Sequence, residues 1–336
     1  MFHLCMPTVR KDARRGRGKS VMRRRLAFAA TSGTVAAAAY YDERIRRQIV
    51  IPVVGGTARV FVRGANNLTL HDEHHLHDGL RRPVGTAMLS VSNHISTMDD
   101  PGMLAAIVPL GTLLDPDAMR WGVCAEDVCF KPGSWLQRCA STAKVMPVRR
   151  GGGVWQAELD AVIAKLRTGD WVHYFPEGVI RQDGQLRLFR RGVGRLVAAV
   201  PEPGALIVLP FYHTGADKVQ PTTQTATSVF SAPNLGTPIH VIFGAHHPRT
   251  QAPSVPPTAA PSRRDATSHA RPSVPLAHGR VRAGPPVDLS RLLALREEPP
   301  FDARPELLYE AIAHSLEEEV ARLKLELEGR LAGRDG

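Results

Sequence analysis

Apolar residues follow two different spacings in the middle of the chain, and these spacings predict strands and helices in alternation. The apolar runs 87–91, 171–175 and 206–211 have the length of buried strands. Residues 159–166 carry apolar side chains at the spacing of one helix face, and Gly169 follows where a helix C-terminus favours glycine. The alternation predicts an α/β fold, with a central sheet flanked by helices and functional loops at the strand ends.

The C-terminal part of the chain carries a longer helical pattern. Apolar residues recur every three or four positions from Pro305 to Glu328, at Leu308, Ile312, Leu316, Val320, Leu323 and Leu327. This pattern predicts an amphipathic helix that docks on the core or on a partner rather than carrying chemistry.

The N-terminal part indicates contact with a membrane surface. Residues 1–25 hold nine Lys/Arg and one Asp, a composition typical both of an organellar import signal and of a basic arm on anionic lipid. Residues 26–41 are mostly apolar, but as a helix they would reach only about 24 Å, less than the roughly 30 Å of a hydrocarbon layer. With the interrupted apolar stretch 49–62, we expect residues 26–62 to associate with one leaflet. A buried helix and strand is the alternative.

Most of the positive charge lies outside the expected core. The formal net charge is +11, to which residues 1–25 contribute +8 and residues 249–282 contribute +5. The remainder is nearly neutral, so the basic composition does not indicate a nucleic-acid-binding fold. Seven prolines between 248 and 275 predict that residues 245–282 form a disordered insertion.

The run Ser92–Pro101 holds the pair of residues most suggestive of catalysis, His94 and Asp99. A neutral imidazole can take a proton from a hydroxyl, and a carboxylate can orient the ring and stabilise its charged form. Residues five apart lie about 140° from each other around a helix, so this pairing requires a turn. Asp100 before Pro101 has the pattern of a helix start, which places His94 in the preceding loop. The alternative is that Asp99 and Asp100 only cap a helix.

Two further motifs contain candidate substrate-binding residues. In the run Phe175-Pro176-Glu177-Gly178, the predicted strand stops at proline and glycine permits a turn. Glu177 could bind acceptor hydroxyls, brace a cationic residue or remain a turn carboxylate in water. Arg149 and Arg150 precede three glycines, and a guanidinium suits a phosphate because its planar fork bonds bidentately. A solvated arginine pair is the alternative.

Other clusters of reactive residues indicate no additional chemistry. The histidines and cysteines lack the spacings of metal sites, so we expect neither a metal nor a cofactor. The four cysteines contain no C-x-x-C pair and suggest no disulfide framework. The chain also lacks the Gly-x-Ser-x-Gly signature of a serine nucleophile. The residues concerned are His71, His74, His75, His77, Cys5, Cys124, Cys129 and Cys139.

Residues 86–244 resemble the tafazzin family of glycerolipid acyltransferases, with the family's blocks in uninterrupted order. The matching blocks are Asn93-His94, Ser96, Met98-Asp99-Asp100-Pro101, Arg120-Trp121, Val128-Cys129-Phe130, Pro147-Val148, Arg150-Gly151, Gly169–His173, Phe175–Gly178 and Gly192–Leu196. The resemblance implies the glycerolipid acyltransferase fold, with residues 63–244 as its core and residues 283–336 as a C-terminal segment.

The same resemblance implies roles for individual residues. His94 would be the general base and Asp99 its orienting carboxylate, while Phe175–Gly178 would bind substrate. Arg150 occupies the place of the family's phosphate-binding arginine. The family has one arginine where this chain has two, so which of Arg149 and Arg150 contacts lipid stays open.

The activity implied by the resemblance is a CoA-independent transacylase that moves acyl chains between phospholipids and lysophospholipids. Its substrates would include cardiolipin and phosphatidylcholine, at mitochondrial membranes, with peripheral or monotopic attachment. A plastid or another organelle stays open as the destination, and no protein partner is indicated. One alternative is an acyl-CoA-dependent lysophosphatidate or lysophospholipid acyltransferase, which would use the same His94 and Asp99. A non-catalytic lipid-binding protein is disfavoured because His94, Asp99 and Glu177 are all present.

Overall fold

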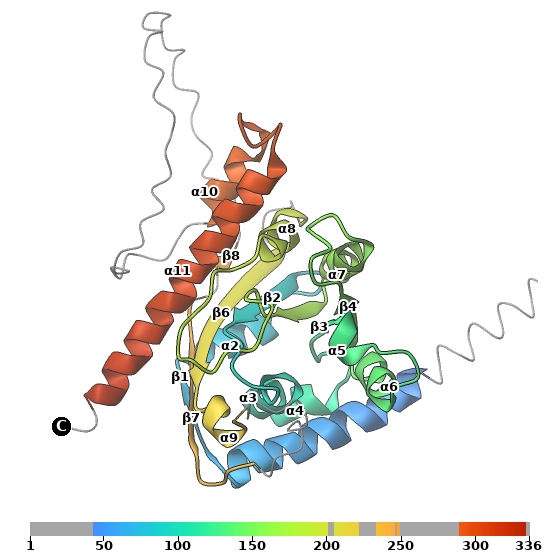
Figure 1. The fold of residues 1–336 in the computed structure, drawn as a ribbon, viewed down its shortest axis with the longest axis vertical. Helices are drawn as coiled ribbons and strands as arrows, with labels where there is room; N and C mark the ends of the chain where they lie inside the picture. Colours follow the sequence, from blue (N-terminus) through green and yellow to red (C-terminus); the bar gives the residue numbers. More distant parts are fainter. Residues whose placement is uncertain (1–42, 201–204, 222–232, 246, 249–288, 334–336) are drawn as a thin grey trace, which may run out of the picture. The chain divides into compact units, whose positions relative to one another are not determined.

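A mixed six-stranded sheet forms the centre of the structure (Figure 1). The computed structural model describes residues 43–200, 205–221, 233–245, 247–248 and 289–333. The order of the main sheet is β1-β7-β6-β2-β5, with β8 paired to β6, and β3 and β4 form a separate pair. The strands are β1 (Asn67–His71), β2 (Ala87–Ser92), β3 (Gly122–Ala125), β4 (Val145–Val148), β5 (Trp171–Tyr174), β6 (Leu206–Thr214), β7 (Pro238–Phe243) and β8 (His247–Pro248).

Helices pack on both faces of the sheet, which confirms the predicted α/β class. One buried cluster joins the sheet to α7, α8 and α11, and a second joins its other face to α2, α3 and α4. The helices are α2 (His74–Leu80), α3 (Leu104–Ile107), α4 (Leu110–Leu114), α5 (Glu126–Cys129), α6 (Trp135–Thr142), α7 (Ala157–Arg167), α8 (Gly192–Ala198), α9 (Ala216–Val219), α10 (Leu289–Ala294) and α11 (Pro305–Ala332).

The central strand β2 runs parallel to both of its neighbours, β5 and β6. Its side chains alternate between the faces: Leu89 and Val91 contribute to the cluster with α7, α8 and α11, and Met88 contributes to the other. All six of its residues are buried, because helices cover both faces of this part of the sheet. Strands β5, β2 and β6 therefore end side by side at one edge of the sheet.

Two helices confirm the periodic patterns read from the sequence. Helix α7 buries its four periodic apolar residues, and Gly169 follows its end with φ of +83°. Helix α11 buries all six residues of its predicted stripe and lies beside β6 and α8 (Figure 1). It is thus docked on the core, which is one of the two placements that the pattern predicted.

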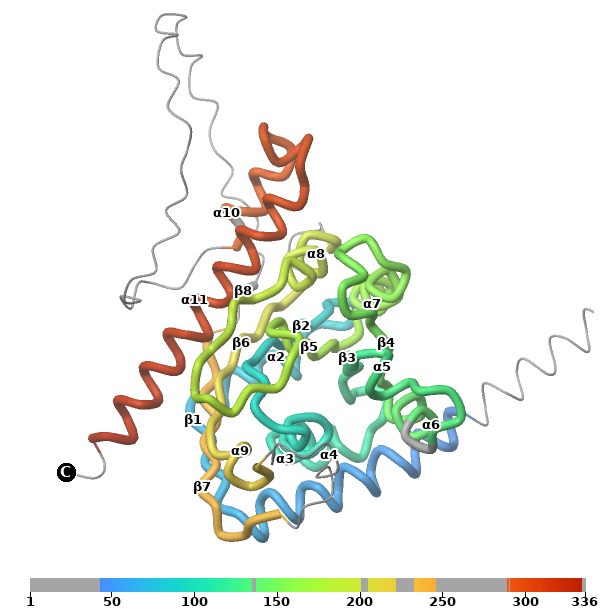
Figure 2. Tube along the Cα trace, viewed as in Figure 1, coloured from blue at the N-terminus to red at the C-terminus, as the bar shows by residue number. Residues whose placement is uncertain are grey.

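Residues 50–59 are helical and continue into a short π-helical turn, η1 (Val60–Gly64). This helix lies beside α3 and α4 (Figure 2), with Gly55 against Leu113. The Arg59 and Arg63 side chains donate hydrogen bonds to backbone carbonyls in and after α3, where cations are stabilised by the helix C-terminus. The opposite side leaves apolar Val53 and Val60 exposed.

The chain divides into a unit that ends at Ile49 and a second that begins at Val50. In the first unit, residues 43–49 are helical. The basic arm 1–25 and nearly all of the expected insertion 245–282 lie outside the described residues. Among the described helices, none combines the length and the apolar character needed to cross a bilayer.

Candidate active site

The ends of three parallel strands bring the candidate site together. His94 follows β2, the run Phe175–Gly178 follows β5, and His213 lies near the end of β6. The register pairs Ser92 of β2 with Phe211 of β6. Carboxyl ends of adjacent parallel strands meet at one edge, which is where open α/β sheets bind their ligands.

His94 and Asp99 are in direct contact. His94 Nδ1 lies 2.9 Å from Asp99 Oδ2, and the same oxygen accepts hydrogen bonds from the backbone N–H groups of Ile95 (2.8 Å) and Ser96 (2.9 Å). Because a carboxylate accepts, Nδ1 carries the ring proton and Nε2 keeps a lone pair. The Asp99 side chain is fully buried, whereas that of His94 is 19% exposed. This geometry suits a general base whose tautomer is fixed by a buried carboxylate.

Asp100 serves a different purpose from the helix cap that the sequence suggested. Its backbone is extended before Pro101, as proline requires of the preceding residue. Its carboxylate forms a buried ion pair with Arg120, and burial lowers the pKa of Arg120 to about 10. Arg120 therefore stays charged at neutral pH and balances Asp100 directly beside the Asp99 turn.

The ring of Phe175 supports the His94 imidazole. The two rings are stacked, with centroids 3.9 Å apart and an interplanar angle of 13°. The chain then turns: Gly178 N–H donates to Phe175 O at 3.1 Å, and Gly178 adopts a φ of +68°, which glycine tolerates without strain. The Arg190 guanidinium packs against Gly178, where a Cβ would approach its Nε to 2.8 Å.

Glu177 is buried, and its carboxylate joins two loops of the site. It is 3% exposed, and its two oxygens accept hydrogen bonds from the backbone N–H groups of His94 (2.9 Å) and Arg187 (3.1 Å). Glu177 is therefore neither a turn carboxylate in water nor a brace for a cationic side chain. A carboxylate has about four acceptor positions, so these two bonds leave its oxygens able to accept from a substrate hydroxyl as well. It ties the loop of His94 to the loop after β5.

The ionisation of Glu177 gives a testable pH dependence of stability. Burial raises the pKa of Glu177 from 4.5 to about 7, opposed less strongly by the hydrogen bond from the His94 backbone. Between these values the folded state binds more protons than the unfolded state, so stability falls as pH rises through about 7. We expect the unfolding free energy of the wild type, relative to Glu177→Gln, to decrease from pH 5 to pH 8, with a slope below about 1.4 kcal/mol per pH unit. Denaturant titrations of both proteins at each pH measure this difference, and a constant difference would contradict it.

Two buried histidines at the site were not singled out from the sequence. His173 Nδ1 lies 2.9 Å from Ser90 Oγ, which also accepts the indole N–H of Trp171 at 2.8 Å. The Ser90 hydroxyl thus joins the side chains of Trp171 and His173 inside the core. Burial, with Arg120 nearby, holds the pKa of His173 well below its ordinary value. The second buried histidine, His213, is 0% exposed.

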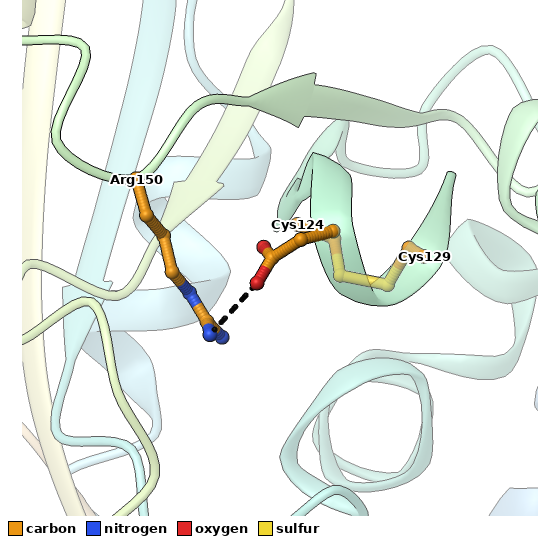
Figure 3. The surroundings of a disulfide bond; sticks show 4 residues. Cys124, Cys129 and Arg150 are labelled. Atoms are coloured by element: carbon orange, nitrogen blue, oxygen red, sulfur yellow. Dashed lines mark hydrogen bonds and ion pairs between the residues drawn. A yellow bond between two sulfur atoms is a disulfide. The ribbon is translucent and has the colours of Figure 1, made fainter. Parts of the chain in front are cut away.

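Arg150 lies outside this hydrogen-bonded cluster, on the loop that follows β4. Its guanidinium pairs with Asp127 at 3.3 Å (Figure 3), and both side chains are exposed. Its neighbour Arg149 pairs with Glu158 at 3.0 Å. Strands β3 and β4 approach the main sheet through a bridge between Trp121 and Val172 of β5. The structure thus brings together His94, Asp99 and the Phe175–Gly178 run, and it places Arg150 on a separate loop.

The cysteine spacings suggested no disulfide framework, but one pair of cysteines does form a disulfide. Cys124 and Cys129 form a disulfide that encloses Asp127, the partner of Arg150 (Figure 3). The short helix α5 brings Cys129 back towards the end of β3, with 6.1 Å between the two Cα atoms, a spacing that suits a disulfide. A five-residue separation without a C-x-x-C motif gave no signal of this turn. Cys139 is free and exposed, and Cys5 lies outside the described residues.

Comparison with known proteins matches this site to a family. Residues 60–214 match the acyltransferase family. N-acylphosphatidylethanolamine synthase of Arabidopsis thaliana is 36% identical over 181 residues, which cover 53% of this chain and 62% of the relative. Tafazzin of Drosophila melanogaster is 33% identical over 178 residues, 53% of this chain and 46% of the relative. A protein named taffazin in Dictyostelium discoideum is 36% identical over 145 residues, 42% of this chain and 48% of the relative.

These matches have a limited extent. The chain spans between 46% and 62% of the length of the three relatives. Within that extent, the family match runs from η1 to the end of β6 and so contains His94, Asp99, Phe175–Gly178 and His213. Residues 60–214 therefore correspond to an acyltransferase domain, and the chain is similar to tafazzins over about half of its length.

Proposed function

We propose that this protein transfers acyl chains to lysophospholipids, with His94 as the general base. The observation that carries the proposal is the contact of His94 Nδ1 with the buried Asp99 carboxylate at 2.9 Å, which leaves Nε2 as the proton acceptor. Nε2 removes the proton of the acceptor hydroxyl as its oxygen attacks the donor's ester carbonyl. The new ester C–O bond forms, the donor's C–O bond breaks, and the departing oxygen takes the proton back from the imidazolium. Asp99 stabilises the imidazolium in between.

The surrounding residues support this chemistry by holding the base in one place. The His94 backbone N–H donates to Glu177, its carbonyl accepts from the Arg181 N–H at 2.9 Å, and its ring stacks on Phe175. Such fixation lowers the cost of reaching the reactive geometry. We assign to Arg150 the phosphate of a lipid substrate, because its exposed guanidinium is held by a single carboxylate and an exposed ion pair of this kind is weak.

The finer proposal is a CoA-independent transacylase that remodels cardiolipin, with phosphatidylcholine as a donor. The similarity to tafazzins supports it. The sequence blocks around His94 and Phe175–Gly178, which resemble those of the tafazzin family, also support it. We further propose that the protein acts at mitochondrial membranes, attached peripherally or monotopically. The exposed apolar side chains Val53 and Val60 support attachment, since an apolar helix face suits the interfacial region of a bilayer.

A second candidate function uses a different acceptor. The relative from Arabidopsis thaliana is named N-acylphosphatidylethanolamine synthase, so the amine of phosphatidylethanolamine is the alternative to a lysophospholipid hydroxyl. A histidine base suits either acceptor, because both must lose a proton to form the new acyl bond. The acyl donor is likewise not fixed by His94 and Asp99, and an acyl-CoA-dependent reaction is the other alternative.

An acyl-transfer assay with purified full-length protein distinguishes these alternatives. We expect labelled acyl chains to move from phosphatidylcholine to lysocardiolipin in detergent–lipid mixtures without CoA, since one glycerol ester replaces another with almost no net free-energy change. Parallel reactions replace the donor with acyl-CoA or the acceptor with phosphatidylethanolamine. Transfer that requires acyl-CoA would contradict the transacylase proposal, and label found only in N-acylphosphatidylethanolamine would support the second candidate. An absence of transfer in every mixture would overturn the enzymatic proposal.

A further inference from the structure

The peptide group that joins Asn93 to His94 is held at both of its ends by buried side chains from other strands. Its N–H donates to Glu177 Oε1, after β5, at 2.9 Å. Its carbonyl, Asn93 O, lies 3.1 Å from His213 Nε2 on β6 and also accepts the Ser92 hydroxyl at 3.0 Å. The orientation of this peptide group determines the position of the His94 side chain.

The backbone of His213 is hydrogen-bonded to the side chain of Asn93. Asn93 Nδ2 donates to His213 O at 2.9 Å, and the His213 N–H donates to Asn93 Oδ1 at 3.0 Å. These two bonds join the end of β2 to the end of β6 just beyond the last paired residues, Ser92 and Phe211. The position of His213 relative to His94 is therefore fixed independently of its own ring.

The ring of His213 can interact with Asn93 in one way only. A carbonyl oxygen accepts and never donates, so Nε2 carries the proton. The same N–H lies 3.8 Å from Asp99 Oδ2, the atom that receives the His94 ring proton. The ring is fully buried, and burial lowers the pKa of His213 despite the opposing effect of Asp99. The Nε2–H group of the neutral His213 ring therefore lies between two acceptors, the Asn93 carbonyl and the Asp99 carboxylate that orients His94.

We propose that His213 is a positioning residue of the acyl-transfer site, whose ring N–H fixes the peptide plane before His94 and lies beside the Asp99 carboxylate. The inference rests on the proposed function of His94. Groups that hydrogen-bond to a catalytic residue, without touching the substrate, hold its orientation and tautomer. A displacement of the catalytic residue by about 1 Å can cost on the order of 100-fold in rate. Because His213 does not reach the reacting atoms, its loss should change turnover rather than substrate binding.

Two substitutions at His213 separate this role from simple packing. His213→Leu keeps the buried bulk and removes the N–H donor, so kcat should fall about 10- to 100-fold while KM changes less than about 2-fold. His213→Gln returns an N–H at similar reach and should keep kcat within about 3-fold of wild type. His71→Leu is the matched control, since His71 is a buried histidine on β1 that contacts His240 instead. Equal kcat in the Leu and Gln variants, at equal melting temperature, would overturn the proposal.

The ring nitrogens of His94 give a second measurement that needs no activity. In 15N-labelled wild-type protein, His94 should show one neutral tautomer with the proton on Nδ1, assigned by its absence in His94→Ala. We expect His213→Leu to give a mixture of tautomers and His213→Gln to keep the single form. An unchanged single tautomer in His213→Leu would contradict the proposal even if its kcat falls. If wild-type protein transfers no acyl chain but the tautomer responds as expected, the proposed function fails and the positioning role stands.

Discussion

Replacing His94 with alanine should lower the rate of acyl transfer by about 10²- to 10⁴-fold, the range that a general base contributes. Nε2 is the only ring nitrogen of His94 free to accept a proton, because Nδ1 is engaged by Asp99 at 2.9 Å. Asp99 Oδ2 keeps its two backbone donors without the imidazole, so the variant should remain folded, with a melting temperature lowered only by the lost contacts of the ring. Initial rates of transfer from phosphatidylcholine to lysocardiolipin, with thermal unfolding of the same preparations, measure both effects.

Matched substitutions make the His94 result specific. His314→Ala removes an exposed histidine from α11 and should keep full activity. Asp99→Asn should also slow turnover, because an amide can hold the ring but stabilises the imidazolium less well than a carboxylate. Wild-type rates in His94→Ala would remove this residue from the mechanism.

The elements that the sequence predicted well are those specified by local pattern. The spacing of apolar residues in α7 and α11 matches the side chains that the structure buries. The pairing of His94 with Asp99 was also local, since both residues and the turn between them fit within ten positions. In each case the necessary information lies in neighbouring residues, so one stretch of sequence is enough to predict the outcome.

The features that the sequence missed depend on which strands lie side by side. His213 reaches the His94 loop because β6 pairs with β2 in one register, and no local pattern at Tyr212–Thr214 indicates that register. The ion pair of Arg120 with Asp100 and the bonds of Glu177 to backbone N–H groups likewise depend on tertiary contacts that no local pattern indicates. The sequence offered one signal of these buried partners, namely a polar residue at the end of an apolar strand. Buried polar groups are nearly always hydrogen-bonded, so such residues indicate a tertiary partner without naming it.

The block Gly192–Leu196, which carries part of the family resemblance, has a structural explanation in the contact between α8 and α11. Gly194 faces the backbone of Tyr309, and a Cβ at Gly194 would overlap the Tyr309 carbonyl. The Tyr309 atoms are backbone, and the position of a Cβ is set by its own backbone, so a change of side-chain rotamer cannot relieve the overlap. The two helices would have to separate, which would loosen α11 from the core it covers through Leu308, Ile312 and Leu316.

Gly194→Ala should therefore destabilise the protein, even though alanine favours helices over glycine by about 1 kcal/mol. Overpacking typically costs 1–3 kcal/mol, and the clash with backbone places this site at about 3 kcal/mol or more. The net loss of about 2 kcal/mol or more should lower the melting temperature by at least roughly 4–8 °C, at about 2–4 °C per kcal/mol for a domain of this size. Gly329→Ala on α11 is the control, because a Cβ there meets no atom within 4 Å and should leave the melting temperature equal or higher. Equal thermal stability of Gly194→Ala and wild type would show that α8 and α11 can separate at no cost, which would contradict the assignment of this block to helix packing.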